Sequence, residues 1–154
     1  MDSRTEIPEL EQVFAAEPVE VAYLFGSRAR GDSGPLSDVD IAVLLAGQPT
    51  AEECARQQLA LLDKVTAHLR RDDVDVVILN RAPLLLQHRV IRDGKVLFCR
   101  DELRRVRYET RALMAYMDFR YYQERYFDAL QERILREGLG ARYRGHPGAA
   151  GQAR

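Results

Sequence analysis

Cysteine is scarce in this chain, and so are long apolar runs. Cys54 and Cys99 are the only cysteines, too few for a disulfide framework or a zinc site, so both are expected to be ordinary buried thiols. No apolar run approaches the ~18 residues that a membrane helix needs. The first six residues lack the basic-then-apolar order of a secretory signal. These absences predict a soluble cytoplasmic protein with no membrane partner.

The chain also has no excess of basic over acidic residues. The 23 basic and 24 acidic residues leave a formal net charge of -1, whereas proteins that grip duplex nucleic acid usually carry clear positive charge. Direct binding of nucleic acid is therefore not expected. Lys64 and Lys95 are the only lysines, and the arginines that supply the remaining positive charge bind phosphate bidentately. A genome-wide preference for arginine codons is the simpler explanation for most of them.

The chain does contain enough apolar sequence for a packed core. Apolar residues make up 46% of its 154 positions and charged residues 31%, which argues against wholesale disorder and low-complexity sequence. Apolar residues at helical spacing predict helices, and β-branched or aromatic runs that end near glycine or proline predict strands. The expected strands are 19–25, 38–46, 74–79 and 95–99, and the expected helices are 7–16, 50–71, 83–94 and 101–137.

The order of these elements is typical of a small α/β (α+β) protein, a mixed sheet flanked by helices. We expect a domain over residues 1–100, a helical extension over 101–137 with room for a break near Tyr121, and a disordered tail over 138–154. The extension has two apolar stripes, and a surface helix needs only one. Either the surplus binds a partner, or the segment bends back and packs both stripes on its own domain. The stripes are Leu103, Val106, Leu113, Met114 and Met117, and then Phe119, Tyr122, Tyr126, Leu130 and Ile134.

Three acidic residues fall at unusual places. Asp38 and Asp40 lie two apart at the head of an apolar strand, so their side chains point to one face, and Asp75 interrupts another apolar strand. If these strands are neighbours, the carboxylates converge, and two charges ~4 Å apart repel by about 4 kcal/mol at an effective dielectric of ~20. A divalent cation would remove that cost, and hard oxygen ligands suit Mg²⁺ or Mn²⁺. Alone, Asp38 and Asp40 also fit the solvated start of a strand.

A polar turn follows the first strand directly. Gly26 lets the backbone approach a phosphate closely, and the Ser27 hydroxyl and nearby N–H groups can donate to it. Arg28 and Arg30 are near enough to neutralise phosphate charge. A phosphate-binding turn one strand away from a carboxylate-bound metal predicts phosphoryl or nucleotidyl transfer. The three histidines have no metal-ligand spacing and are expected to be structural or solvated: His68, His88 and His146.

These residues resemble a known family. Residues 26–31 (Gly-Ser-Arg-Ala-Arg-Gly) and 37–41 (Ser-Asp-Val-Asp-Ile) look like the signature of the minimal nucleotidyltransferases of the DNA polymerase β superfamily. The superfamily pattern is Gly-Ser, roughly ten residues, Asp-x-Asp on a strand and a later acidic residue, which Asp75 matches. The resemblance implies the polymerase β-like fold and a metal-bound nucleoside triphosphate with Asp38 and Asp40 as metal ligands. It also implies that Asp75 is a shared ligand or the base that takes a proton from the attacking hydroxyl.

Small members of this kind are similar to the antitoxins of HEPN/MNT toxin–antitoxin pairs. That resemblance implies transfer of AMP from ATP to a tyrosine of a HEPN ribonuclease toxin, with Mg²⁺ or Mn²⁺ as cofactor and the toxin as protein partner. Two other functions compete with it. A nucleotidyltransferase for small molecules such as aminoglycosides usually has an extra helical domain, for which the residues after Leu97 leave little room. A binding module would neutralise its partner by contact alone.

Overall fold

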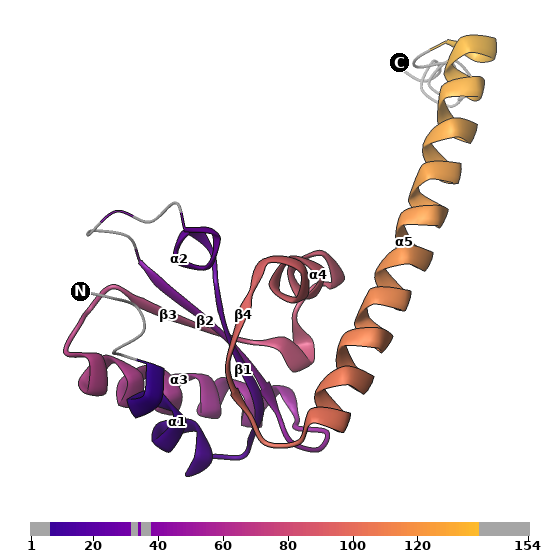
Figure 1. Ribbon diagram of the computed structural model, residues 1–154. Helices are drawn as coiled ribbons and strands as arrows, with labels where there is room; N and C mark the ends of the chain where they lie inside the picture. The colour runs from indigo at the N-terminus through magenta and orange to yellow at the C-terminus, as the bar shows by residue number, and fades with distance from the viewer. Residues whose placement is uncertain (1–6, 32–33, 35–37, 139–154) are drawn as a thin grey trace, which may run out of the picture. The chain divides into compact units, whose positions relative to one another are not determined.

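The computed structural model describes residues 7–31, 34 and 38–138. They form two compact units, one that ends at Tyr116 and one that begins at Met117. The first unit contains the sheet and most of the helices (Figure 1). His146 and nearly all of the expected tail lie outside the described residues. None of the helices in the described part of the chain is long and apolar enough to span a membrane.

Four strands form one mixed sheet. They are β1 (Val19–Phe25), β2 (Val39–Leu45), β3 (Val74–Ile78) and β4 (Lys95–Cys99). Their order across the sheet is β3-β2-β1-β4. β1 pairs antiparallel with β2 and with β4, whereas β2 and β3 run parallel. The mixed sheet is confirmed, and β2 and β3 are neighbours, as convergence of the acidic residues requires.

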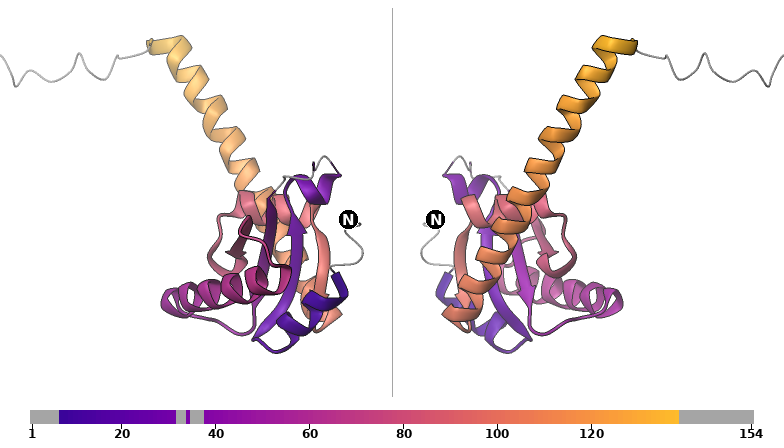
Figure 2. Two further views of the ribbon diagram at one scale, coloured as in Figure 1. Left: turned by 90° about the vertical axis from the view of Figure 1, so that its left-hand side faces the viewer. Right: turned by 90° about the vertical axis from the view of Figure 1, so that its right-hand side faces the viewer.

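Helices cover both faces of this sheet. α1 (Ile7–Ala15) and α3 (Ala51–Leu69) lie on one face, and α4 (Leu84–Asp93) lies on the other (Figure 2). The first face buries a large core that includes Phe14, Ile41 and Leu61. The second buries a smaller core of Tyr23, Ala42, Leu79 and Val90, and Tyr108 of α5 (Glu102–Glu137) packs against it. Both cores come from alternate residues of the same strands, because side chains alternate across a sheet.

Short elements and caps fix the connections. α2 (Ser27–Arg30) follows β1, and the 3₁₀ turn η1 (Leu79–Arg81) follows β3. Thr50 caps α3 in a capping box with Glu53, in which each side chain bonds the other residue's backbone N–H. In η1, the Asn80 amide accepts from Leu45 N at 2.8 Å and donates to Leu45 O at 3.0 Å. Asn80 thereby holds the end of β2 beside η1.

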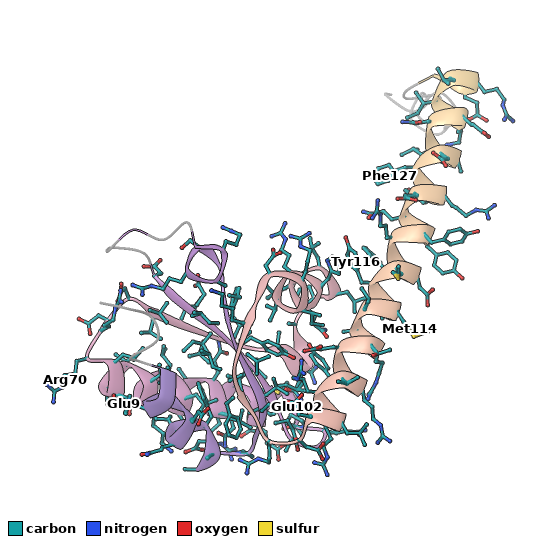
Figure 3. The ribbon with its side chains drawn as sticks, viewed as in Figure 1. Glu9, Arg70, Glu102, Met114, Tyr116 and Phe127 are labelled. Carbon is teal, nitrogen blue, oxygen red and sulfur yellow. The ribbon has the colours of Figure 1, made fainter. Side chains whose placement is uncertain are left out.

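The start of α5 packs through a different face from the expected one. Ala112 is buried, Tyr108 packs on the sheet, and Tyr116 stacks on His88 of α4 with ring centroids 3.8 Å apart. Figure 3 shows Tyr116 on the side of α5 toward α4 and Met114 on another side. Of the two alternatives for the first stripe, packing on its own domain does not hold for its members in the first unit, all of which are exposed: Leu103, Val106, Leu113 and Met114. α5 also continues unbroken through Tyr121.

Candidate active site

Two of the predicted acidic residues lie opposite each other at one edge of the sheet. In the parallel pairing of β2 with β3, Asp40 is the register partner of Asp75, and in the antiparallel pairing Asp40 is the partner of Phe25. Val39, Ile41 and Val76 point to the opposite face, where they join the core under α1 and α3. The alternation of the strands therefore directs both carboxylates to the α4 face. Asp38 precedes β2 by one residue and is exposed.

Gly26 lies against the Asp40 carboxylate. Its φ of 75° is in the left-handed region that glycine tolerates. A β-carbon built on Gly26 would collide with Asp40 Oδ2 and would lie 3.2 Å from Asp40 Cγ. The absence of a side chain at this residue is therefore what makes room for the Asp40 carboxylate beside the turn after β1.

The surroundings of Asp40 disfavour the ionised form of its carboxyl. Burial raises the pKa of its carboxyl above the usual value, and the negative charges of Asp75 and Asp38 raise it further. Asp38 and Asp75 thus lie close enough to Asp40 for their charges to act on its carboxyl. Within residues 7–31, 34 and 38–138, however, no three His, Cys, Asp or Glu side chains converge into a ready-made metal cage. Asp40 and Asp75 are brought together by the register, whereas Asp38 and Asp75 remain exposed.

The residues of the glycine–serine turn spread over the same edge. Gly26 precedes the single helical turn α2, which begins at Ser27. The pKa of Asp73 is lowered chiefly by its hydrogen bond from Arg71 and in smaller part by the charge of Arg28, so Arg28 lies toward the start of β3. The charge of Arg30 instead helps to lower the pKa of Asp93 at the end of α4, where the hydrogen bond from Arg92 is the main cause. The charge of Arg28 thus acts on a carboxylate just before β3, and the charge of Arg30 acts on one at the end of α4.

A basic cavity opens beside Gly26. It has a volume of about 480 Å³ and lies between the end of β1, α2 and α4. Arg30 lines it, together with two arginines that the sequence analysis did not single out, Arg89 and Arg92. Their spacing of three residues places them on one face of α4, which is visible in the sequence. What the sequence could not show is that this face lies beside the glycine–serine turn. The remaining lining residues are Phe25, Gly26, Leu86 and Asp93.

Comparison with known proteins agrees with this arrangement. The family model described as polymerase beta, nucleotidyltransferase matches residues 9–103. The chain belongs to this family. The match runs from α1 to the first residues of α5 and so includes the whole sheet, Gly26 and all three acidic residues. The polymerase β-like fold expected from the sequence is confirmed.

Two curated family relatives and one solved structure are similar to this chain. The protein adenylyltransferase MntA of Shewanella oneidensis is 38% identical over 95 residues, which are 62% of this chain and 58% of that protein. The chain thus spans little more than half of this relative. The protein adenylyltransferase MntA of Aphanizomenon flos-aquae is 27% identical over 130 residues, 79% of this chain and 84% of that protein. A crystal structure of a toxin–antitoxin with AMP-PNP matches with a TM-score of 0.64 and 25% identity, over 84% of this chain and 99% of that one.

Proposed function

We propose that this chain is a Mg²⁺- or Mn²⁺-dependent protein adenylyltransferase that acts as an antitoxin in the cytoplasm. It transfers AMP from ATP to a tyrosine of a HEPN ribonuclease toxin and thereby silences the toxin. The observation that carries the proposal is the pairing of Asp40 with Asp75 beside the side-chain-free Gly26. The names of the two adenylyltransferase relatives and the AMP-PNP in the similar toxin–antitoxin structure support the choice of reaction and nucleotide.

The carboxylates suit a divalent cation. Asp38, Asp40 and Asp75 offer hard oxygen donors. Burial is the main cause of the raised pKa of Asp40, and the negative charges of Asp75 and Asp38, which a cation would neutralise, raise it further. In this proposal the exposed side chains of Asp38 and Asp75 turn toward the ion, and Asp40 is already oriented. When bound, the ion would supply charge stabilisation for the triphosphate.

The transfer itself is a substitution at the α-phosphorus of ATP. The tyrosine hydroxyl oxygen forms a bond to that phosphorus, and the bond from the phosphorus to the oxygen bridging to the β-phosphate breaks, so pyrophosphate leaves. Asp75 takes the hydroxyl proton, because it lies across from Asp40 and is open to solvent and to an incoming side chain. Positioning and charge stabilisation supply most of the catalysis of such transfers.

The glycine–serine turn and the basic cavity would hold the triphosphate. Gly26 and Ser27 present backbone N–H groups and a hydroxyl where the chain can approach a phosphate closely. Arg30, Arg89 and Arg92 line the cavity beside Gly26 and would neutralise the phosphates. Arg28 lies on the other side of the turn and would face the end of the site near β3.

A transfer assay tests the proposal. The chain is incubated with ATP labelled at the α-phosphate, Mg²⁺ and the HEPN protein encoded beside it, and the modified toxin residue is identified by mass spectrometry. We expect labelled AMP on a tyrosine, and loss of transfer in the double variant Asp38→Asn/Asp40→Asn. Asp63→Asn is the matched control, because Asp63 is an exposed carboxylate of α3 on the other face of the sheet.

The same assay separates the competing functions. Undiminished transfer by the double variant would show that the metal-ligand assignment is wrong. Inhibition of the toxin by the chain without ATP would favour a binding-only antitoxin. AMP transfer to an aminoglycoside instead of the toxin would favour the small-molecule enzyme.

A further inference from the structure

Three exposed tyrosines lie near one another on α5. They are Tyr121, Tyr122 and Tyr126, which are 53%, 71% and 66% exposed and belong to the second unit. The other described tyrosines are buried or half-buried in the first unit: Tyr23, Tyr108 and Tyr116. An enzyme that modifies tyrosine needs a hydroxyl that can enter its active site and reach the base there. Within the described residues, the exposed three are therefore the hydroxyls of this chain that meet this need.

The Tyr121 hydroxyl differs from the others in the direction of its hydrogen bond. Arg125 Nη1 donates to the Tyr121 oxygen at 2.5 Å, and because a guanidinium can only donate, the phenolic proton stays free for a base. The hydroxyls of Tyr23 and Tyr108 instead donate their protons to a carboxylate and to an amide oxygen. The two exposed neighbours of Tyr121 form no hydrogen bond with the described residues. Among the described tyrosines, Tyr121 thus combines an oxygen polarised by a cation with a proton that can leave.

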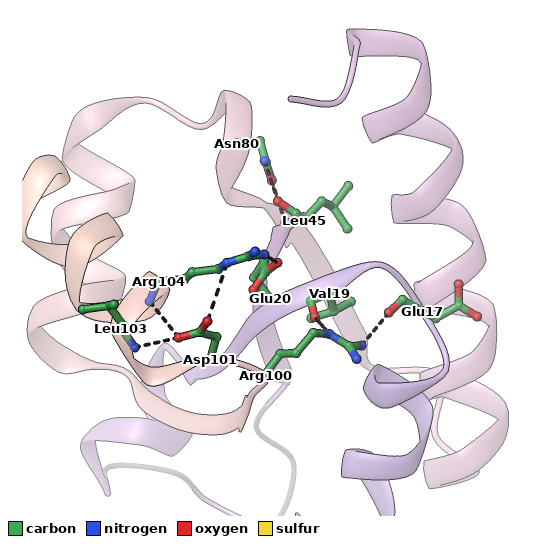
Figure 4. A network of polar contacts seen from close by, with 9 residues as sticks. All are labelled: Glu17, Val19, Glu20, Leu45, Asn80, Arg100, Asp101, Leu103 and Arg104. Atoms are coloured by element: carbon green, nitrogen blue, oxygen red, sulfur yellow. Dashed lines mark hydrogen bonds and ion pairs between the residues drawn. The ribbon is translucent and has the colours of Figure 1, made fainter. Parts of the chain in front are cut away.

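Arg125 also places a positive charge where a phosphate would arrive. Its guanidinium carbon lies 5.5 Å from the centroid of the Tyr121 ring, so the ring and the hydroxyl together hold the cation against the acceptor oxygen. Arg104 of the same helix instead neutralises a carboxylate, that of Glu20 (Figure 4). Arg125 forms no ion pair with the described residues, so its charge is left for an incoming phosphate. Arginine binds phosphate strongly and stabilises phosphoryl groups during transfer.

We propose that this chain transfers AMP from ATP to Tyr121 of a second copy of itself. This inference rests on the proposed adenylyltransferase function and adds a second acceptor to it. The Tyr121 hydroxyl oxygen forms a bond to the α-phosphorus, the bond from that phosphorus to the oxygen bridging to the β-phosphate breaks, and pyrophosphate leaves. Asp75 of the modifying copy takes the phenolic proton. Arg125 of the modified copy then pairs with the phosphodiester anion that has formed on Tyr121.

Self-modification would compete with modification of the toxin. Both acceptors are tyrosine hydroxyls delivered by another chain, and both need the same active site. The modified fraction of the chain would therefore be greatest when toxin is scarce. The reaction would also replace a neutral hydroxyl on an exposed helix with a nucleotide that carries a negative charge, and so change the surface of α5.

A mixture of two complementary variants tests the inference. Asp38→Asn/Asp40→Asn keeps the acceptor but cannot transfer AMP, whereas Tyr121→Phe can transfer AMP but lacks the acceptor. The two full-length chains are incubated together with ATP labelled at the α-phosphate and Mg²⁺, without toxin. Trypsin releases residues 121–125 of the double variant as YYQER, and fragmentation in the mass spectrometer distinguishes Tyr121 from Tyr122. We expect AMP on Tyr121 of the double variant, and at least about tenfold less label when either chain is incubated alone.

Matched single variants of the active chain make the test specific. Tyr126→Phe should leave self-labelling unchanged, because this exposed tyrosine has no arginine bonded to its hydroxyl among the described residues. Arg125→Gln should lower self-labelling about tenfold, because the arriving phosphate loses its cation. Arg133→Gln removes the charge of an exposed arginine about two turns further along α5 and should have no effect.

Transfer to the HEPN protein is measured with the same preparations, so the two proposals can fail separately. Loss of both transfers in the unaltered chain would overturn the proposed function and the inference with it. Labelling of the toxin without label on Tyr121 of the double variant would overturn self-modification alone. Undiminished self-labelling of Tyr121→Phe would move the acceptor to another residue, and undiminished self-labelling of Arg125→Gln would remove the reason for choosing Tyr121; either result would overturn the inference.

Discussion

The hydroxyl of Tyr23, on the central strand β1, donates a 2.8 Å hydrogen bond to Glu109 of α5. Tyr23 is 1% exposed, and Glu109 also accepts a 3.0 Å bond from Arg105. Burial raises the pKa of Tyr23 well above its usual range, and the bond and charge of Glu109 raise it further, so the hydroxyl keeps its proton at neutral pH. This contact ties the start of α5 to the middle of the sheet.

Removal of the Tyr23 hydroxyl tests that contact. Tyr23→Phe leaves the buried ring in place but deprives Glu109 of a donor, so we expect a loss of about 1–2 kcal/mol in the free energy of unfolding. Urea denaturation measures it. Tyr122→Phe is the control, because Tyr122 is 71% exposed and makes no hydrogen bond with the described residues. Equal stability of both variants would contradict the role of the contact.

Gly26→Ala is predicted to damage the site more than the fold. Gly47 provides a matched control, because its φ of 72° is as unusual but a β-carbon there would meet nothing within 4 Å. Both variants should lose about 1–3 kcal/mol of stability, because each places a side chain on a backbone with positive φ. Only Gly26→Ala also displaces Asp40, so AMP transfer should fall at least tenfold more in it than in Gly47→Ala. Equal loss of transfer in the two variants would mean that Gly26 acts through the backbone alone.

The raised pKa of Asp40 predicts how stability depends on pH. The folded chain holds this proton more tightly than the unfolded chain, so the stabilising effect is full at low pH and is lost as pH rises through the raised pKa. Asp40→Asn cannot ionise. Its melting temperature without metal should therefore match that of the unaltered chain near about pH 3 and exceed it at about pH 7.

Thermal melts in EDTA across this range check the prediction, with Asp63→Asn as the exposed control. Mg²⁺ at neutral pH should raise the melting temperature of the unaltered chain and not that of Asp40→Asn. A difference in melting temperature between the unaltered chain and Asp40→Asn that does not change with pH would contradict the raised pKa of Asp40.

The basic cavity predicts an effect on ATP binding. Arg89→Gln should raise the KM for ATP about tenfold and change kcat less, because Arg89 lies exposed at the cavity and would contact phosphates that do not react. Arg81→Gln, with the same loss of charge on an exposed residue of η1 outside the cavity, is the control. Steady-state kinetics with varied ATP separate the two parameters. An unchanged KM in Arg89→Gln would remove this arginine from the nucleotide site.

Much of the fold could be predicted because local rules decide it. The strand at 19–25 is β-branched and aromatic, and it appears with the same bounds. The capping box at Thr50 set the start of α3, which begins one residue later. From the sequence, convergence of the acidic residues depends on β2 and β3 being neighbours. In the structure these two strands pair directly.

Other features depended on contacts between distant residues. α5 packs through Tyr108, an aromatic residue with a polar end, and Ala112, a small residue. This pair does not stand out in the sequence as an apolar stripe. Arg89 and Arg92 look like ordinary surface arginines until α4 is placed beside Gly26. Glu20 lies within an otherwise apolar strand, and only its partner Arg104, far along the chain, explains its burial.

The register between β2 and β3 couples the core of this protein to its chemistry. Val74, Val76 and Ile78 pack under α3, and this packing leaves Asp75 on the opposite face. A slip of one residue would bury the acid and expose the valines, because side chains alternate strictly. The hydrophobic residues on the other face of β3 thus keep Asp75, the general base of the proposed reaction, opposite Asp40. Core substitutions that loosen β3 should therefore silence the enzyme while much of the protein remains folded.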